Sequence, residues 1–280
     1  MRKPNNETVV LITGAANGIG YHTAVDLAEK GYQVILTSRI INRPYLLALA
    51  KKHPNILLKK LEVTDTEEKI NTLINQLGPI DVLINNAAFG IVGVAESVSE
   101  SQIQSIFATN VLGVVKVTNA VLPGMRERNV GMILTISSIV GPLPDMRQCF
   151  YSGSKAMIEH YTAQIKNDLK DNGYNNIVVA NIHPGPVVTN FESSASVGER
   201  FNGRTNPYPS MQSDVEKWRE LMQKGRPVSE SVETIANVIA SKKPTFWNPT
   251  EKRVAENFAA VYVDPNGERF AQGPIFKSNL

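Results

Sequence analysis

A glycine-rich turn near the N-terminus constrains the fold of this chain more than any other feature. It reads Thr13-Gly14-Ala15-Ala16-Asn17-Gly18-Ile19-Gly20, it follows the apolar run 9–12, and an apolar-periodic segment continues from it to Lys30-Gly31. A strand, such a turn and a helix start leave backbone N–H groups facing a pocket, where the helix dipole favours a phosphate. Glycine suits positions where φ is positive or where the backbone approaches a pyrophosphate closely. The pattern therefore predicts a dinucleotide-binding turn.

Short β-branched runs alternate with longer amphipathic segments along the chain. We expect strands at 9–13, 34–37, 56–63, 82–84, 132–137 and 177–182, and helices at 19–30, 43–52, 67–77, 101–128 and 152–172. This alternation predicts an α/β fold, a three-layer doubly wound parallel sheet of the Rossmann-like kind with helices on both faces. Ligands of such sheets bind beyond the carboxyl ends of the strands.

The last hundred residues are less regular. Residues 190–226 are rich in Ser, Gly, Asn and Pro, with a short helical patch at 213–224 that carries Trp218. Because this segment follows the expected ligand edge, we interpret it as a substrate lid. We also expect a helix at 229–241 and a last strand at 259–263 that closes the sheet. With 280 residues and 42% hydrophobic content, the chain predicts one catalytic domain, 1–280, with its lid at about 190–226.

Composition excludes several classes of function. The formal net charge of +3 is small and scattered, which argues against a nucleic-acid partner. No apolar run approaches the roughly 20 residues that cross a bilayer, so we expect no membrane span. A single cysteine, Cys149, cannot form an internal disulfide and suits a reducing compartment. We therefore expect a cytoplasmic protein. A homodimer or homotetramer is a separate expectation that composition does not test.

Two further features bear on location and on metals. The C-terminal Ser278-Asn279-Leu280 differs at one position from the Ser-Lys-Leu peroxisomal address, so peroxisomal import is an alternative to the cytoplasm. The four histidines are scattered without cysteine or carboxylate partners at ligand spacing, so the sequence predicts no metal site.

Tyr151 and Lys155 form a pair suited to acid–base chemistry. They stand four residues apart at the start of an expected helix and therefore share a face, with Ser138 upstream. A free tyrosine ionises near pH ~10, and a neighbouring positive charge favours the phenolate and brings proton transfer toward neutral pH. The plain alternative is an exposed helical pair, but the glycine-rich turn makes the chemical interpretation the stronger one.

These motifs together resemble the short-chain dehydrogenase/reductase family. The resemblance covers residues 8 to about 189, where the motifs stand in the family's order and spacing. The matching segments are the glycine-rich turn, Asn85-Asn86-Ala87-Ala88, Thr109-Asn110-Val111, Ser138, Tyr151 with Lys155, and Pro184-Gly185-Pro186-Val187-Val188-Thr189. The sequence around Ser138 and the run 181–192 are most similar to the carbonyl-, steroid- and retinoid-active members. Ala88 replaces a usual glycine, and Glu62 replaces a usual aspartate near the adenine.

The resemblance implies a mechanism for which the side chains are suited. Tyr151 would give a proton to a ketone oxygen, or take one from an alcohol, while hydride moves to or from the nicotinamide. Lys155 would lower the tyrosine pKa and bind the ribose hydroxyls. Ser138 would hold the substrate oxygen, with Ser137 as the alternative. Asn110 would position a water molecule that relays protons toward Lys155, or else would only stabilise a helix irregularity.

The resemblance also implies which residues bind the cofactor, and the end of the second strand indicates which cofactor it is. No acidic residue stands there to repel a 2′-phosphate, whereas Ser38 and Arg39 suit one, so NADP(H) is favoured over NAD(H). A surface Arg39 that only stacks on adenine is the alternative. The expected cofactor-binding residues are Thr13, Gly14, Asn17, Gly18, Ile19, Gly20, Ser38, Arg39, Glu62, Val63, Asn86, Ala87, Tyr151, Lys155, Pro184, Gly185, Val187 and Thr189.

Apolar side chains indicate the substrate class. We expect the cleft to be lined by Phe89, Ile91, Val92, Leu143, Met146, Phe191 and Trp218. The predicted function is thus the NADP(H)-dependent interconversion of a hydrophobic ketone or aldehyde with its alcohol. The alternatives are a catalytically silent nucleotide-binding sensor or scaffold and an epimerase or dehydratase of the same family.

Overall fold

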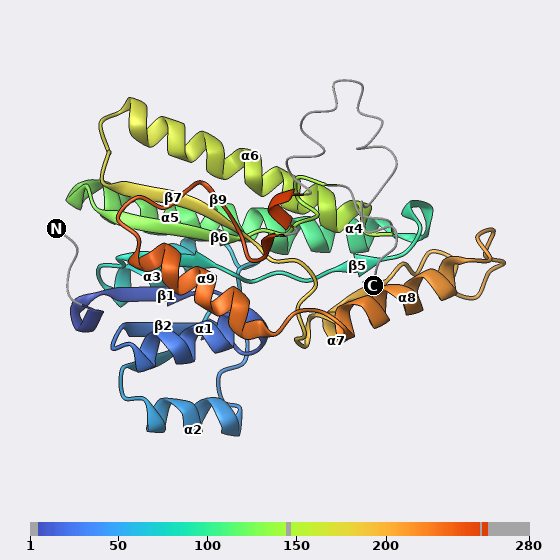
Figure 1. Ribbon diagram of the computed structural model, residues 1–280, viewed down its shortest axis with the longest axis horizontal. Helices are drawn as coiled ribbons and strands as arrows, with labels where there is room; N and C mark the ends of the chain where they lie inside the picture. Colours follow the sequence, from blue (N-terminus) through green and yellow to red (C-terminus); the bar gives the residue numbers. More distant parts are fainter. Residues whose placement is uncertain (1–4, 144–146, 253, 257–280) are drawn as a thin grey trace.

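The computed structural model describes residues 5–143, 147–252 and 254–256. In this part of the chain, seven parallel strands form one sheet in the order β3-β2-β1-β4-β6-β7-β9. The strands are β1 (Val9–Ile12), β2 (Gln33–Ser38), β3 (Ile56–Lys60), β4 (Val82–Asn85), β6 (Gly131–Ile136), β7 (Ile177–His183) and β9 (Trp247–Pro249). The predicted three-layer parallel sheet is confirmed, with helices above and below it in Figure 1.

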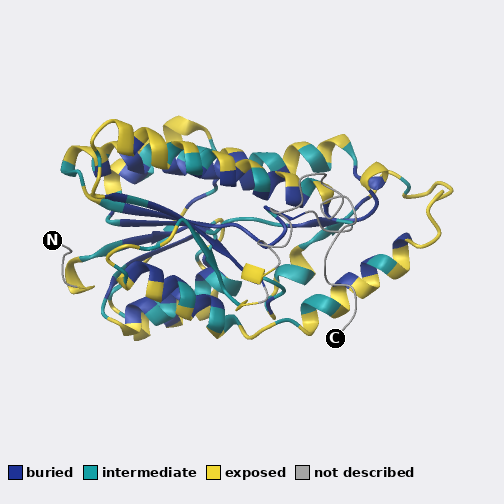
Figure 2. Cartoon of the chain, turned by 45° about the horizontal axis from the view of Figure 1, so that its top comes forward, coloured by how far each residue is buried: buried dark blue, intermediate teal, exposed yellow. Residues whose placement is uncertain are grey.

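Adjacent residues of the central strands pack against opposite helical layers. In β1, Val10 and Ile12 face α1 (Gly18–Glu29), α2 (Pro44–Lys52) and α9 (Val228–Ala240). Leu11 faces the other layer, formed by α3 (Glu67–Leu77), α5 (Gly113–Arg128) and α6 (Cys149–Asp171). Side chains alternate along a strand, so a strand that is apolar at every position is buried on both faces. Figure 2 shows the result, a buried sheet between helices whose outer faces are exposed.

One helical segment departs from a regular α-helix. The predicted helix 101–128 consists of α4 (Glu100–Phe107), a π-helical turn (Ala108–Leu112) and α5. By length and composition the whole segment Glu100–Arg128 could cross a bilayer, contrary to our expectation that no segment could. Half of its apolar window is buried inside the fold, as it is in the core helix of a sheet protein.

The lid is joined to the sheet by small elements that periodicity did not predict. A two-residue strand β5 (Ile91–Val92) pairs with β8 (Ser196–Val197), beside α7 (Phe191–Ser194). Helix α8 (Met211–Gln223) then extends away from the sheet in Figure 1. The last described strand is β9, which pairs with β7. The strand predicted at 259–263 lies outside the described residues.

Candidate active site

The glycine-rich turn lies against the end of β4. Asn86 Nδ2 donates to the carbonyl oxygens of Thr13 (2.9 Å) and Gly14 (3.1 Å), and Thr13 Oγ1 accepts from the Asn86 and Ala87 backbone N–H groups. Gly14 has φ +63°, and a Cβ there would lie 2.7 Å from the Ala87 Cα. A Cβ at Gly20 would clash with the Asn86 amide. These glycines therefore allow the close packing that opens the N-terminus of α1 to a ligand.

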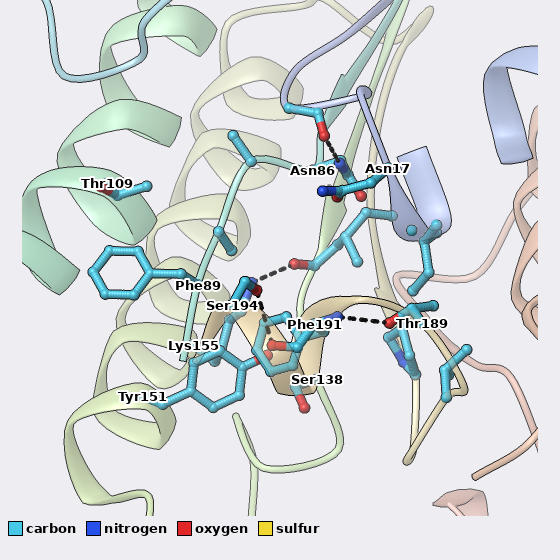
Figure 3. Close-up of a pocket in the computed structure, with 18 of the residues that line it drawn as sticks. Asn17, Asn86, Phe89, Thr109, Ser138, Tyr151, Lys155, Thr189, Phe191 and Ser194 are labelled. Atoms are coloured by element: carbon cyan, nitrogen blue, oxygen red, sulfur yellow. Dashed lines mark hydrogen bonds between the residues drawn. The ribbon is translucent and has the colours of Figure 1, made fainter. Parts of the chain in front are cut away.

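A single cavity of about 640 Å³ runs from this turn to Tyr151 and the lid. Figure 3 shows Asn17 and Asn86 at one end, with Ser138, Tyr151, Lys155 and Phe191 gathered at the other. Most of the expected cofactor-binding residues line this cavity: Gly14, Asn17, Gly18, Ile19, Ser38, Arg39, Glu62, Val63, Asn86, Ala87, Tyr151, Lys155, Pro184, Gly185, Val187 and Thr189. Thr13 and Gly20 are not among the described residues that line the cavity; they pack the turn against Asn86 and Ala87 instead.

The end of β2 presents positive charge to the cavity. Arg39 lines it with a side chain that is 78% exposed, and its Nε lies 3.7 Å from Glu62 Oε2. Arg43, directly before α2, lines the same end of the cavity. Sequence reasoning missed Arg43 as a site residue. Its spacing of four residues from Arg39 was the available signal.

Ser138, Tyr151 and Lys155 converge, as expected. All three are buried, at 9%, 7% and 3% exposure. Lys155 Nζ donates to the Ile136 carbonyl (2.7 Å) and lies 5.7 Å from the centre of the Tyr151 ring. Ser138 hydrogen bonds with the Tyr151 hydroxyl, whereas the Ser137 hydroxyl lowers the pKa of Glu159. The geometry thus favours Ser138 over Ser137 as the partner of the phenol.

The pKa values differ from the simple expectation. Burial raises the pKa of Tyr151 above its ordinary value of 10, and the Ser138 hydrogen bond only partly offsets this. The net pKa of Tyr151 is raised because desolvation of the phenolate is the largest effect on it, so the lowering by Lys155 that the resemblance implies stays a prediction. Burial also lowers the pKa of Lys155 to about 8, against the attraction of Glu159. Tyr151 is therefore protonated at neutral pH.

Asn110 is fully buried in the π-helical turn, and its amide is used on protein atoms. Its Nδ2 donates to the Phe89 carbonyl (2.9 Å) and to Ser154 Oγ (3.1 Å), and its Oδ1 accepts from the Phe89 N–H (3.1 Å). It is not among the described residues that line the cavity, whereas its neighbour Thr109 is. The side chain therefore joins the β4 loop to α6 and supports the irregular helix, which was the structural alternative.

Residues of the segment 190–226, which we interpret as a lid, line the cavity near Tyr151. Phe191, Trp218, Leu221 and Met222 line it, and the Phe191 ring lies 5.5 Å from the Tyr151 ring. Of the apolar residues expected to line the cleft, Phe89, Phe191 and Trp218 do so. Ile91, Val92 and Leu143 pack in the clusters beneath it, and Met146 lies outside the described residues.

An ion pair anchors the lid helix to the loop before α6. Arg147 donates to Asp214 Oδ2 through Nε (2.9 Å) and Nη2 (2.5 Å). The hydrogen bond from Arg147 holds the pKa of Asp214 below its ordinary value of 3.8. Cys149 lies between Arg147 and Tyr151 in the sequence and is exposed. Sequence reasoning had no signal for the ion pair, since 67 residues separate its members.

A metal site has no support in the described part of the chain. No group of three or more His, Cys, Asp and Glu side chains gathers there.

Comparison with known proteins shows the family of this chain. The family model described as short chain dehydrogenase matches residues 8–199. The chain is 32% identical to human retinol dehydrogenase 8, over 94% of this chain and 88% of that protein. It is also 32% identical to the 3-ketodihydrosphingosine reductase of Bacteroides thetaiotaomicron, over 85% and 86% of the two chains.

Solved structures agree on the fold. A short-chain dehydrogenase from Streptomyces avermitilis superimposes with a TM-score of 0.80 and 26% identity, covering 95% of each chain. A serine dehydrogenase complexed with NADP+ has a TM-score of 0.70 and 26% identity, covering 86% of this chain and 94% of that one. A Burkholderia phymatum relative in complex with NAD has a TM-score of 0.83 at 19% identity, covering 98% and 99%, and bears on the fold alone. Structural neighbours therefore include both NAD and NADP complexes.

Proposed function

This chain belongs to the short-chain dehydrogenase/reductase family, whose members are oxidoreductases that act on CH–OH and C=O groups with a nicotinamide cofactor. We propose that it uses NADP(H) to reduce a hydrophobic ketone or aldehyde to its alcohol. The convergence of Ser138, Tyr151 and Lys155 at the end of a cavity that begins at the glycine-rich turn carries this proposal. The reverse oxidation would require the Tyr151 phenolate, which the raised pKa disfavours at neutral pH.

The cavity suits a dinucleotide. The close approach of Gly14 to Ala87 leaves the α1 N-terminus open, and the cavity extends from there without interruption to Tyr151. A bound nicotinamide would supply the hydride for the carbonyl carbon. Tyr151, protonated at neutral pH, would donate its proton to the carbonyl oxygen, and Ser138 would hold that oxygen by a hydrogen bond. Phe191 would exclude water from the reacting atoms.

The preference for NADP(H) is supported by charge. Arg39 and Arg43 both line the cavity at the end of β2, and β2 ends at Ser38 without a carboxylate. A guanidinium binds a phosphate through charge-assisted hydrogen bonds. Glu62 lies against Arg39 at a mostly exposed contact, which contributes little on its own.

The preference for a hydrophobic carbonyl is supported by the lid side of the cavity, where Phe89, Phe191, Trp218, Leu221 and Met222 supply apolar surface. Two relatives are consistent with this class, since their names refer to retinol and to 3-ketodihydrosphingosine. We expect retinal, long-chain 3-oxoacyl thioesters, steroid ketones and 3-ketosphinganine to be better substrates than small polar ketones.

A spectrophotometric screen tests the proposal. NADPH oxidation is measured with each of these carbonyls, with pyruvate as a polar control, and is repeated with NADH. We expect turnover with at least one hydrophobic carbonyl and faster turnover with NADPH. Absence of NADPH oxidation with every carbonyl, or turnover confined to pyruvate, would overturn the proposed function.

The substitution Arg39→Asp tests the cofactor preference separately. Replacing a guanidinium by a carboxylate removes a contact worth about 1.5–3 kcal/mol to a phosphate and adds repulsion. The ratio of kcat/KM for NADPH to that for NADH should fall at least about tenfold. Arg219→Asp, on the exposed part of α8, is the matched control for loss of one surface arginine. An unchanged ratio in Arg39→Asp would contradict the assignment.

A further inference from the structure

A buried carboxylate lies one helical turn beyond Lys155. Tyr151, Lys155 and Glu159 follow one another at intervals of four residues in α6 and therefore share its inner face. Glu159 is 8% exposed. Side chains on a helix lean toward its N-terminus, so the Glu159 side chain is directed back toward the turn that carries Lys155. A charged group in such a position must be compensated, because isolated buried charges are costly.

Two residues of β7 hold both oxygens of this carboxylate. His183 Nε2 lies 2.7 Å from Glu159 Oε1, and Asn181 Nδ2 donates to Glu159 Oε2 at 2.8 Å. His183 and Asn181 are themselves fully buried, and Asn181 Nδ2 also donates to Thr162 Oγ1. Burial alone would raise the pKa of Glu159, but these hydrogen bonds and the Ser137 hydroxyl outweigh it and lower the pKa. An ionised carboxylate only accepts hydrogen bonds, so His183 Nε2 carries the hydrogen.

Lys155 is a buried cation, and its nearest hydrogen-bond partner carries no charge. It is 3% exposed, and its ammonium donates to a neutral acceptor, the Ile136 carbonyl. Burial lowers its pKa to about 8, and the one charge recorded as opposing that fall is Glu159. Among the described groups of this region, Tyr151 and Glu159 face Lys155 from α6, and His183 faces Glu159 from β7. The strand β6 and the two residues after it, Ser137 and Ser138, contribute only hydroxyl and carbonyl groups.

We propose that Glu159 is a positioning residue for the reaction, the buried counter-charge that keeps the Lys155 ammonium protonated where the Ile136 carbonyl holds it, with His183 and Asn181 holding the carboxylate in place. The kinetic consequence rests on the proposed function, whereas the electrostatic relation concerns this chain alone. The competing explanation is that the hydrogen bonds of Glu159 to β7 only stabilise the packing of α6 on β7. The two differ in one observable, the ionisation of Lys155.

The test measures the Lys155 pKa directly, in the whole protein, by NMR of the ¹³Cε signals of labelled lysine. The Lys155 signal is assigned by its loss in Lys155→Met. Glu159→Gln removes the charge and keeps an oxygen that can accept from His183, and Glu159→Met removes the charge with an apolar chain of similar length, should the glutamine variant not fold. Glu159→Asp restores the charge. Thr162→Val removes the hydroxyl that accepts from Asn181 and leaves every charge in place.

We expect the charge-removing variants to lower the Lys155 pKa from about 8 to about 7 or below, a tenfold change in the ionisation equilibrium. Glu159→Asp should recover most of this change. Thr162→Val should lower the unfolding temperature without moving the Lys155 pKa. In NADPH oxidation, the alkaline limb of kcat should move to lower pH in Glu159→Gln while the KM for the carbonyl stays within about twofold.

A Lys155 pKa that is unchanged in Glu159→Gln or Glu159→Met, with only the unfolding temperature reduced, would overturn the inference in favour of the competing explanation. This result is distinguishable from failure of the proposed function. If the proposed function fails, the wild-type protein oxidises no NADPH with any carbonyl, while the lysine titration still reports whether Glu159 changes the Lys155 pKa.

Discussion

The two halves of the cavity are built in different ways. On the cofactor side, the ends of β1, β2 and β4 and the turn after β1 form the wall through backbone geometry, with short connections and close packing. On the substrate side, residues 190–226 form the wall through side-chain contacts between segments far apart in sequence, such as Tyr208 with Glu96 and Arg147 with Asp214. The first half is specified locally, whereas the second depends on tertiary contacts.

The difference extends to packing. The cluster on the α1 side of the sheet contains more than twenty buried hydrophobic residues, whereas the buried members of the lid cluster are Val92, Val215 and Trp218. A small core with exposed polar contacts opens at lower free energy than a large one. We therefore expect substitutions that alter the cofactor wall of the cavity to weaken NADPH binding, and substitutions in the lid to change the substrate KM and leave NADPH binding intact.

The largest effect should come from Gly14→Ala. Gly14 has φ +63°, and an added Cβ would lie 2.7 Å from the Ala87 backbone, so the phosphate-binding turn must move. We expect NADPH affinity, measured by fluorescence titration, to fall by about a hundredfold or more, from the loss of two or three charge-assisted hydrogen bonds.

Gly203→Ala is the matched control in the lid. Gly203 has φ +72°, but nothing lies within 4 Å of an added Cβ. The substitution should cost only the strain of a left-handed residue, about 1–2 kcal/mol, and leave NADPH affinity unchanged. Equal loss of NADPH affinity in both variants would show that backbone strain, and not the close approach to Ala87, is responsible.

Trp218→Ala should have the next largest effect. Trp218 is 7% exposed, belongs to the small lid cluster and lines the cavity. Removing a buried aromatic side chain costs about 1.5–3 kcal/mol of apolar contact, so the KM for a hydrophobic carbonyl should rise roughly tenfold or more. NADPH affinity should stay within about twofold, and Trp218→Phe should recover most of the loss. Weakened NADPH binding in Trp218→Ala would break the distinction between the two halves.

Asp214→Asn should have the smallest effect. The Arg147–Asp214 pair is partly exposed, so its contribution is about 0.2–1 kcal/mol, and the substrate KM should rise about twofold to fivefold. Asp26→Asn, which breaks the exposed pair with Lys30 on α1, is the matched control and should leave the KM unchanged. A KM that rises as much in the control would count against a role for the pair in lid closure.

The same pair predicts a pH dependence. The pKa of Asp214 is lowered in the folded protein, so its carboxylate stabilises the lid at pH values above the ordinary Asp pKa of 3.8. That stabilisation is lost as pH falls through the lowered folded value. Limited proteolysis of the lid should therefore accelerate in acid in the wild type, and show less acid dependence in Asp214→Asn.

Most of the sheet could be predicted because its central strands are apolar at consecutive positions and each is followed by turn residues or a helix start. The bounds of α1, α3 and α9 differ by no more than one residue from those predicted. The two-residue strands β5 and β8 carry no periodicity, and β9 contains Asn248 and Pro249, so tertiary pairing alone defines them.

The site divides in the same way. Tyr151, Lys155 and the glycine turn could be predicted because their spacing is local. The raised pKa of Tyr151 could not, because it depends on burial by Phe191 and other distant segments. Glu159 was missed because a glutamate in a helix is ordinarily solvent-exposed, although its spacing of four residues from Lys155 was available. His183, predicted neither as a ligand nor as a partner, is joined to Glu159 only by the packing of α6 on β7.

The central claim is that Tyr151 gives a proton to a carbonyl oxygen in an NADPH-binding cavity. Tyr151→Phe tests it most directly, because the ring stays packed against Phe191 while the hydroxyl is lost. With the best carbonyl from the screen, we expect kcat to fall at least about a hundredfold, the scale of an acid–base group, while the NADPH dissociation constant stays within about threefold. Turnover comparable to the wild type would contradict the account, as would loss of NADPH binding in step with activity.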